Sequence, residues 1–281
     1  MKLVVQKETT LLNYLYENLD MPKKKIKEYL KYGSIYVDGN KTTQFNYPLT
    51  NGSKIIIDTK SKNSFTLPFP VIYEDNNIIV IDKPSNLLTI STAKEKEDTA
   101  YHLVSRYLKS KNPHSKVFIV HRLDKDTSGV LLLAKNEQVK NLYQKDWNTN
   151  VKRNYIAIVH GKPRKQKETL INNLKETKTN LVYINKDGKE AITTYELLQN
   201  TKNYSKLKID ISTGRKNQIR VQLAAINIPI VGDKKYGQKD KEKRLYLHAN
   251  SLTVYNPIEK KNFTYTAKIP KAFNQILKLD K

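Results

Sequence analysis

Short apolar runs separated by polar turns recur along most of the chain. These runs are rich in Val, Ile and Leu, which is typical of buried strands. Helical spacing of apolar residues appears in three stretches of the larger part, residues 100–109, residues 137–147 and a stretch after Gly214 in which Ile219, Leu223 and Ile226 share a face. The pattern therefore predicts a domain dominated by strands, which lie at residues 77–81, 117–120, 130–134, 152–161, 188–195, 205–211 and 244–249. Between these elements, residues 162–188 are basic and poor in pattern, and we expect a hairpin or a mobile flap there.

Residues 1–60 show a different pattern, with two short helices followed by a small hairpin. Thr10 can cap the first helix, and Asp20 and Pro22 separate it from the second helix, residues 23–31. The hairpin occupies residues 35–58. The apolar positions expected to face inward are Leu12, Leu15, Tyr16 and Leu19 in the first helix, and Ile26, Tyr29 and Leu30 in the second.

The second helix carries lysines on its other face, at positions 23, 24, 25, 27 and 31. A basic helix face is suited to contact nucleic-acid phosphates, although a merely solvated face gives the same pattern. The order of helices, hairpin and turns resembles the S-four RNA-binding domain of ribosomal-protein type, and this resemblance implies RNA binding. We therefore divide the chain into an RNA-binding domain at 1–60, a linker at 61–70 and a large domain at 71–281.

Composition favours an anionic partner. The chain has 281 residues, a net charge of +24 and 44 Lys against 7 Arg. A positive charge distributed over both parts favours nucleic acid, although a genome biased toward Lys would explain some of it. The chain has no Cys, which excludes disulfides and thiolate metal sites. No apolar run is long enough for a signal peptide or a membrane span, so we expect a cytoplasmic protein without membrane association.

The most informative stretch is His121–Gly129, which lies between two predicted buried strands. Asp, Thr, Ser and Gly also make ordinary turns, so a plain loop is the simpler reading. However, all seven specified positions match the HRLDxxTSG signature, and the stretch resembles that of the RluA-type pseudouridine synthases. The resemblance implies that Asp124, rather than Asp126, is the catalytic nucleophile.

Further motifs extend this resemblance over roughly residues 71–268. They lie at 82–86, where Asn86 replaces a usual Gly, and at 152–161, 188–195, 213–223, 229–237 and 244–249. Asn217 stands where the family usually has His, and Asn227 replaces a common Gly. The resemblance implies an α+β fold whose large domain is built on a mixed, mainly antiparallel sheet with flanking helices. We expect the strand at 244–249 to close this sheet, and a helix to open at Gly214.

The resemblance also implies residue roles. An RNA pseudouridine synthase converts uridine to its C-glycoside isomer without cofactor or metal. Tyr155 is expected to stack on the target base and to help remove the C5 proton. Arg220 is expected to pair with Asp124 and keep it ionised, with its own side chain half buried. Arg122 is expected to fill the place of the extruded base, and Arg215 and Lys83 to hold phosphates.

Other functions remain open at this point. The same scaffold would serve a non-catalytic RNA-binding or ribosome-assembly protein. A hydrolase using Asp124 and Asp126 would need the two carboxylates to converge, and we expect them to diverge. Five scattered His residues without an HExxH motif do not favour zinc, and no phosphate-binding glycine motif is present. For an RNA enzyme, ribosomal RNA is the favoured substrate with transfer RNA still possible, and we expect a monomer.

Overall fold

The computed structural model describes residues 1–31, 33–58, 65–91, 99–145, 147 and 151–280. The chain forms two compact units, the first made of residues 1–66 with 107–113 and the second of 67–106 with 114–281. Four positions of the predicted linker, residues 61–64, lie outside the described residues. None of the helices in the described part is both long and apolar enough to cross a membrane.

A small antiparallel sheet and two helices form the first unit. The sheet has the strand order β1–β6–β3–β4, and a separate two-stranded ladder joins β2 to β5. Its elements are β1 (Lys2–Val4), β2 (Thr9–Thr10), α1 (Leu11–Asn18), α2 (Lys23–Lys31), β3 (Ile35–Val37), β4 (Asn40–Thr42), β5 (Pro48–Leu49) and β6 (Lys54–Ile57). The predicted helix–helix–hairpin order is therefore present, with two strands added before the first helix.

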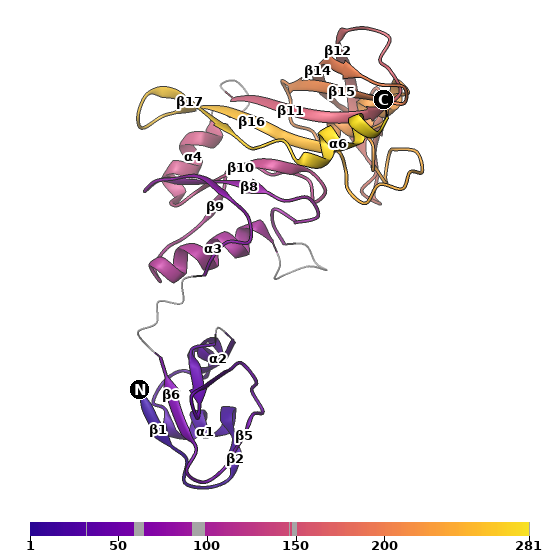
Figure 1. Cartoon of the computed structure of the whole chain (residues 1–281). Helices are drawn as coiled ribbons and strands as arrows, with labels where there is room; N and C mark the ends of the chain where they lie inside the picture. Colours follow the sequence, from indigo (N-terminus) through magenta and orange to yellow (C-terminus); the bar gives the residue numbers. More distant parts are fainter. Residues whose placement is uncertain (32, 59–64, 92–98, 146, 148–150, 281) are drawn as a thin grey trace. The chain divides into compact units, whose positions relative to one another are not determined.

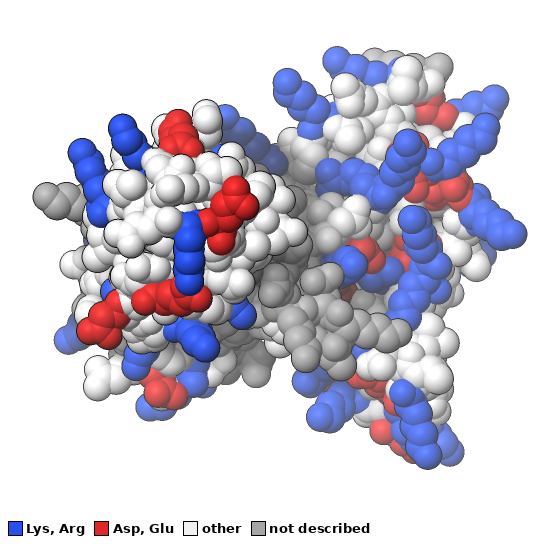
Figure 2. Space-filling view, turned by 90° about the horizontal axis from the view of Figure 1, so that it is seen from below, with Lys and Arg blue, Asp and Glu red and all other residues white. Residues whose placement is uncertain are grey.

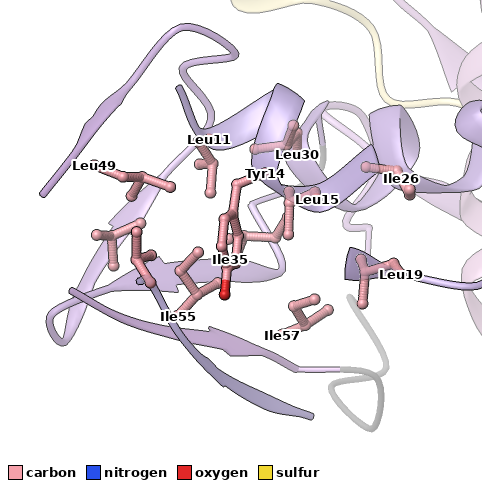
Figure 3. Close-up of a cluster of buried hydrophobic side chains, with 12 residues drawn as sticks. Leu11, Tyr14, Leu15, Leu19, Ile26, Leu30, Ile35, Leu49, Ile55 and Ile57 are labelled. Carbon is pink, nitrogen blue, oxygen red and sulfur yellow. The ribbon is translucent and has the colours of Figure 1, made fainter. Parts of the chain in front are cut away.

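The core of this unit gathers side chains from both helices and the sheet (Figure 3). In α2 the predicted positions Ile26 and Leu30 are fully buried. In α1 the buried residues are Leu11, Tyr14 and Leu15, whereas the predicted positions Leu12 and Tyr16 are partly buried and pack against the same core. Thr10 is the N-cap residue of α1, but its side chain makes no capping hydrogen bond.

An 11-stranded sheet is the framework of the second unit (Figure 1). Its main path is β13–β12–β14–β15–β11–β16–β10–β8–β7, with β17 beside β16 and β9 beside β10. The strands are β7 (Val71–Glu74), β8 (Ile78–Lys83), β9 (Phe118–Ile119), β10 (Ser128–Ala134), β11 (Val151–His160), β12 (Lys167–Glu176), β13 (Val182–Ile184), β14 (Lys189–Asn200), β15 (Tyr204–Ile211), β16 (Leu247–Asn256) and β17 (Lys261–Thr266). The hairpin expected within 162–188 is β12–β13.

The sheet is mixed but mainly antiparallel, as predicted. Only the pair β10–β16 is parallel among the described strands. The burial of each strand follows its position, because β10 is buried along its whole length, whereas β14 alternates buried and exposed residues. The strand expected at 244–249 starts at Leu247, and β16 lies inside the sheet between β11 and β10 instead of closing it. Strand order depends on contacts between distant segments, which the local pattern does not contain.

The other described helices are α3 (Ala100–Lys111), which the division into units splits after residue 106, and α4 (Glu137–Lys145), α5 (Gln218–Ala225) and α6 (Lys271–Leu279), which belong to the second unit. Val139 and Tyr143 of α4 join a core cluster with residues of β8, β10 and β16. Phe273 of α6 is fully buried and packs against the ring of Tyr246. Helix α5 starts at Gln218 and not at Gly214, because residues 213–217 form a turn that ends with Asn217 in the left-handed region.

Two of the three substitutions noted in the motifs are explained by backbone conformation. Asn86 has φ 65° and Asn227 has φ 62°. Both values lie in the left-handed region, which asparagine tolerates better than most residues. The prediction that the turn at Asn86 survives without glycine is therefore confirmed.

Gly129 permits the close approach of the parallel strands β10 and β16. It has φ +115°, and a Cβ added to it would lie 2.1 Å from the carbonyl oxygen of Ala249. A side chain at this position would therefore push β10 away from β16. Because β10 begins within the His121–Gly129 stretch, at Ser128, this close approach holds the end of that stretch against the middle of the sheet.

Positive side chains are spread over the molecular surface. Figure 2 shows Lys and Arg across the face in view, with fewer Asp and Glu between them. This distribution agrees with the net charge of +24. It favours a polyanionic partner.

Candidate active site

The loop that carries Asp124 connects β9 to β10, and the segment 83–89 fastens it. Three side chains of that segment donate hydrogen bonds to carbonyl oxygens of the loop. These bonds run from Lys83 Nζ to Lys125 (3.2 Å), from Ser85 Oγ to Asp126 (2.7 Å) and from Thr89 Oγ1 to Leu123 (2.7 Å). Because the loop backbone is held on both sides of residue 124, the backbone position of Asp124 is fixed by the rest of the unit.

Lys83 is not placed to hold a phosphate, so this prediction is wrong. Its side chain is 0% exposed, and its ammonium also donates to the carbonyl oxygens of Pro84 (2.9 Å) and Leu87 (2.8 Å). Burial lowers the pKa of Lys83 to about 7, although Asp126 and Asp124 act in the opposite direction. Lysine side chains usually extend into solvent. Here the buried Lys83 side chain links the segment 83–89 to the Asp124 loop by hydrogen bonds.

Asp124 lines a cavity of about 260 Å³ between its loop, β11 and the start of α5. Apolar walls come from Val120, Ile219 and Leu247. Tyr155 lies in the same lining, together with the arginines at positions 122, 153, 215 and 220. The cavity is slightly smaller than the roughly 300–1,000 Å³ typical of drug-sized ligands, so its size suits a single nucleobase.

The Asp124 carboxylate accepts a hydrogen bond from Asn217, with 2.6 Å between Nδ2 and Oδ2. Asn217 is 8% exposed and has φ 52°. The sequence motif located this residue but gave it no role. The structure brings it to Asp124 from a position 93 residues away in the chain.

The predicted ion pair between Arg220 and Asp124 is not formed. Instead, Arg220 makes two hydrogen bonds to Asp233, from Nε to Oδ2 (2.8 Å) and from Nη2 to Oδ1 (2.6 Å). Arg220 is 5% exposed, so it is buried and not half buried as expected. Asp233 was missed as a partner, although it lies inside the motif at 229–237. Asp124 is close enough only to act on Arg220 through its charge.

Opposing effects set the pKa values of this pair. Burial alone would lower the pKa of Arg220, but the hydrogen bonds and charge of Asp233 outweigh burial and raise it. Burial would likewise raise the pKa of Asp233, but Arg220 and two backbone N–H groups lower it. Both groups are therefore held in their charged forms, and Arg220 provides a fixed positive charge behind Asp124.

Tyr155 is 9% exposed and belongs to β11. Burial raises the pKa of Tyr155 to about 12, and the charge of Asp124 acts in the same direction while Arg153 opposes it. The phenol therefore keeps its proton at neutral pH, so its anion is not available there as a base for the C5 proton. A protonated ring in the cavity wall remains suited to stack on a base.

Arg153 is a cavity residue that the sequence analysis did not single out. It is 7% exposed, and its Nη2 donates to the carbonyl oxygen of Ser212 (2.9 Å). Its Nε has no hydrogen-bond partner within the described structure, and no carboxylate there forms an ion pair with it. The sequence feature that could have identified Arg153 is its place in the motif at 152–161, where Arg stands at a Lys position.

Arg122 and Arg215 lie at the rim of the cavity, and both are exposed. Arg215 donates from Nε to the carbonyl oxygen of Glu190 (2.8 Å), which anchors its side chain. Both residues therefore line the same cavity as Asp124. Their roles toward substrate remain predictions.

A second cavity of about 500 Å³ adjoins the first and shares Arg122, Asp124 and Asn217 with it. Asp126 lines this second cavity but not the first. Its carboxylate points toward Arg220, with 4.0 Å between Oδ2 and Nη1. Both carboxylates therefore line the larger cavity, whereas Asp124 alone of the two lines the smaller one.

His121 has a structural part in the loop. Its Nε2 accepts a hydrogen bond from the backbone N–H of Leu132 (3.0 Å), and its ring stacks on Trp147 with centroids 4.6 Å apart. Burial, followed by the charge of Arg153, lowers the pKa of His121 to about 3. The ring is therefore neutral at neutral pH. Across the described residues, no group of three or more His, Asp or Glu is arranged to hold a metal ion.

Comparison with known proteins identifies the family. A family model described as RNA pseudouridylate synthase matches residues 77–225. The ribosomal large subunit pseudouridine synthase C of Rickettsia bellii is 34% identical over 247 residues, which cover 83% of this chain and 80% of that protein. The ribosomal large subunit pseudouridine synthase D of Borreliella burgdorferi is 33% identical over 246 residues, covering 80% and 75%.

Solved structures agree on the fold. Human RNA Pseudouridylate Synthase Domain Containing 4 matches with a TM-score of 0.63 at 22% identity, over 74% of this chain and 91% of that one. The matched family model spans the Asp124 loop, Tyr155 and Arg220. The chain therefore belongs to the RNA pseudouridylate synthases, which are isomerases that act on RNA.

Proposed function

We propose that this pseudouridine synthase modifies specific uridines of ribosomal RNA and uses Asp124 as its catalytic carboxylate. The observation that carries the proposal is the cavity that brings Asp124 and Tyr155 together among arginine side chains. The names of the relatives, which are ribosomal large subunit pseudouridine synthases, favour ribosomal over transfer RNA. A ribosomal substrate also favours the cytoplasm as the place of action. We expect a monomer, because one chain supplies all the residues of the site.

The reaction is an isomerisation in which every atom of the uridine is kept. The C1′–N1 bond breaks, the uracil turns within the cavity, and a C5–C1′ bond forms. The proton on C5 then passes to solvent, which is the step that tritium release reports, and N1 takes up a proton from solvent, so that the product has the same composition as uridine. Asp124 serves this sequence either as a nucleophile at C1′ or as a base toward a sugar proton, and both roles use the ionised carboxylate.

The other cavity residues bind and orient the RNA and stabilise developing charge. Tyr155 stacks on the extruded base with its hydroxyl protonated. Arg122 occupies the place that the base leaves, and extrusion costs a few kcal/mol. Arg215 contacts a phosphate at the rim. Arg153 and Arg220 face the negative charge that develops on the departing uracil, because a preorganised cation is most effective in a site from which water is excluded.

The first unit is proposed to bind RNA as an S-four-type domain. Its support is the lysine face of α2, where Lys23, Lys24, Lys25 and Lys27 are all exposed. The opposite face of α2 is anchored by Ile26 and Leu30, so these lysines are held on a rigid element. A rigid row of ammonium groups can follow a phosphate backbone.

The test is to map pseudouridines in total RNA from cells with and without the gene. We expect one or a few sites in ribosomal RNA to disappear and to return when the parent gene is restored. Restoring the gene with Asp124→Asn should leave those sites unmodified. Loss of sites only in transfer RNA would overturn the proposed substrate. The non-catalytic alternative would be supported if no site changed while ribosome assembly was impaired.

A further inference from the structure

Asn217 is the described side chain that hydrogen bonds directly to the Asp124 carboxylate. The bond is 2.6 Å long, and the Asn217 side chain is buried. Hydrogen bonds that end on an ionised acceptor are shorter and stronger than those between neutral groups. A bond of this kind restricts the rotation of the carboxylate about its Cβ–Cγ bond.

The orientation of the Asn217 amide is itself determined. Its Oδ1 accepts from the Tyr236 hydroxyl (3.2 Å) and lies 3.4 Å from Lys235 Nζ. Reversing the amide would place oxygen against the Asp124 carboxylate and the NH₂ group against two donors. The hydrogen-bond network therefore allows one orientation, with Nδ2 toward Asp124.

The backbone at Asn217 also directs this side chain. The residue has φ 52° and ψ 19° and precedes the first turn of α5. Asparagine is one of the few residues other than glycine that readily adopt this conformation. Tyr236 is fixed in turn, because its hydroxyl accepts from the backbone N–H of Val182 (2.9 Å).

Arg220 cannot supply the same constraint, because its Nε and Nη2 groups are committed to Asp233. Its charge stabilises an anion nearby but does not select one rotamer of Asp124. We propose that Asn217 is the positioning residue that aligns the Asp124 carboxylate with the target nucleotide. This inference rests on the proposed catalytic role of Asp124.

A neutral donor has a functional consequence. Asn217 stands where related sequences usually have histidine, and an amide does not change its charge between pH 5 and 8, whereas imidazole does. The alignment of Asp124 in this protein is therefore independent of protonation at position 217. The charged or titratable groups around this pair in the described structure come from the linings of both cavities and from the hydrogen-bond network beside them: Lys83, His121, Arg122, Lys125, Asp126, Arg153, Tyr155, Arg215, Lys216, Arg220, Lys234, Lys235 and Tyr236.

Replacement of Asn217 by aspartate gives a signature that a general packing defect would not give. The side chain keeps its shape but loses its donor and places a second carboxylate against Asp124. At pH 8 both groups are charged and repel each other, and we expect the single-turnover rate to fall roughly 10- to 100-fold, the effect of losing one charge-assisted hydrogen bond. As the pH falls, the two carboxyls share a proton, and the protonated carboxyl introduced by Asn217→Asp can donate to Asp124 again.

The measurement is tritium release from C5-labelled uridine in one RNA, as a single-turnover rate from pH 5 to pH 8. The rate of Asn217→Asp divided by the rate of the parent should rise as the pH falls. Dividing by the parent removes titrations common to both proteins, including that of Lys83. RNA affinity, measured by filter binding, should stay within about threefold, because the change alters alignment rather than phosphate contacts.

Asn227→Asp is the matched control. It places the same substitution at the other end of α5, at a residue with φ 62° that is exposed. Its rate relative to the parent should be close to one at every pH. A parent-like rate for Asn217→Asp at pH 8, or a deficit that does not change with pH, would overturn the proposal.

Two further variants cover the case in which Asn217→Asp fails to fold. Asn217→Gly keeps the backbone conformation without a side-chain donor, whereas Asn217→His restores an N–H group. The histidine variant should be faster than the glycine variant, and equal rates would also overturn the proposal. Asp124→Asn is measured in the same series. A parent that is inactive on every RNA would contradict the proposed function, whereas an active parent with an unaffected Asn217→Asp would contradict only this inference.

Discussion

Two carboxylates lie on either side of the start of α5, and their surroundings are opposite. Asp233 is 2% exposed and accepts four hydrogen bonds, two from Arg220 and two from the backbone N–H groups of Lys235 and Tyr236. Asp124 is partly exposed to the cavity and accepts one side-chain hydrogen bond within the described structure, from the neutral Asn217. One carboxylate has its bonding capacity filled, and the other keeps most of its capacity for a ligand.

The difference separates a structural charge from a reactive one. A buried carboxylate with a bidentate guanidinium partner is a poor nucleophile, because its lone pairs are already engaged. A carboxylate held by a single neutral donor keeps a free oxygen that can face the sugar or base. The positive charge of Arg220 still interacts with the Asp124 carboxylate. In this site Arg220 therefore stabilises negative charge, whereas Asn217 aligns the carboxylate.

The largest effect should come from Asp124→Asn. Loss of the reactive carboxylate should lower the single-turnover rate by at least about 10³-fold, since neither nucleophilic nor base catalysis is then available. The melting temperature and RNA affinity should change little, because Asp124 carries little of the hydrogen bonding of the fold. Asp126→Asn, two residues away in the same loop, is the control and should keep substantial activity. A rapid Asp124→Asn enzyme would contradict the assignment.

Asp233→Asn should act on stability instead. It removes the bidentate partner of the buried Arg220 guanidinium and leaves the Asp126 carboxylate at 4.0 Å. Breaking a fully buried pair typically costs about 3–5 kcal/mol, and the remaining charge of Asp126 should reduce that loss. The free energy of unfolding of the second unit, from urea titration at pH 7, measures this loss. Asp210→Asn removes an exposed carboxylate from β15 and should change the stability little. If Asp233→Asn were as stable as the parent, Asp233 would not be the structural carboxylate that distinguishes it from Asp124.

The pH dependence of that loss has a defined sign. The pKa of Asp233 is lowered from its ordinary value of 3.8 in the folded protein. Its ionised form therefore stabilises the fold above about pH 4, and this contribution is lost as the pH falls through the lowered pKa. The difference between the parent and Asp233→Asn should be constant from pH 8 to pH 5 and should shrink only in stronger acid.

Arg153→Met should reduce the rate more than the affinity. We expect roughly a 10²-fold fall in kcat, the typical effect of removing one preorganised donor that faces developing charge. Lys152→Met is the matched control, because Lys152 lies next to Arg153 in β11 but is exposed. Steady-state kinetics on one RNA separates the two parameters. A rise in KM with kcat unchanged would instead mean that Arg153 contacts a phosphate of the bound RNA.

The smallest effect should come from the lysines of α2. Like Asp124, these exposed charges have capacity left to contact RNA. Replacing Lys24 and Lys27 by Gln should lower the slope of log affinity against log salt by about 0.7 to 0.9 for each lysine that contacts a phosphate. Lys271→Gln with Lys278→Gln, two exposed lysines of α6, is the control pair. Equal slopes for the two double variants would mean that α2 is not an RNA contact.

The sequence predicted the elements and the identity of the site better than its contacts. Strand and helix positions follow from local periodicity, and the stretch at 121–129 is contiguous, so both could be recognised. Local periodicity could not predict the position of β16 in the sheet or the inward face of α1. In α1, Leu11, Leu12, Leu15 and Tyr16 offer two overlapping apolar faces, and only packing against the sheet selects one of them.

Two errors in the predicted site have a common cause. Arg220 has three acidic residues nearby, and the choice of Asp233 depends on distances of a few ångströms that no motif encodes. Lys83 was assigned to the surface because lysine is rarely buried. Its burial is stable because three carbonyl oxygens converge on its ammonium, and such convergence exists only in the folded chain.

The ties that hold the Asp124 loop also determine when the site can exist during synthesis. They connect residues separated in the chain by 34 positions for Thr89 and Leu123, 93 for Asn217 and Asp124, and 120 for Ser128 and His248. Contacts between such distant positions form slowly, because long loops must close first. A nascent chain cannot complete this cavity until His248 has left the ribosome. The enzyme therefore becomes active only after the chain has been made at least as far as residue 248.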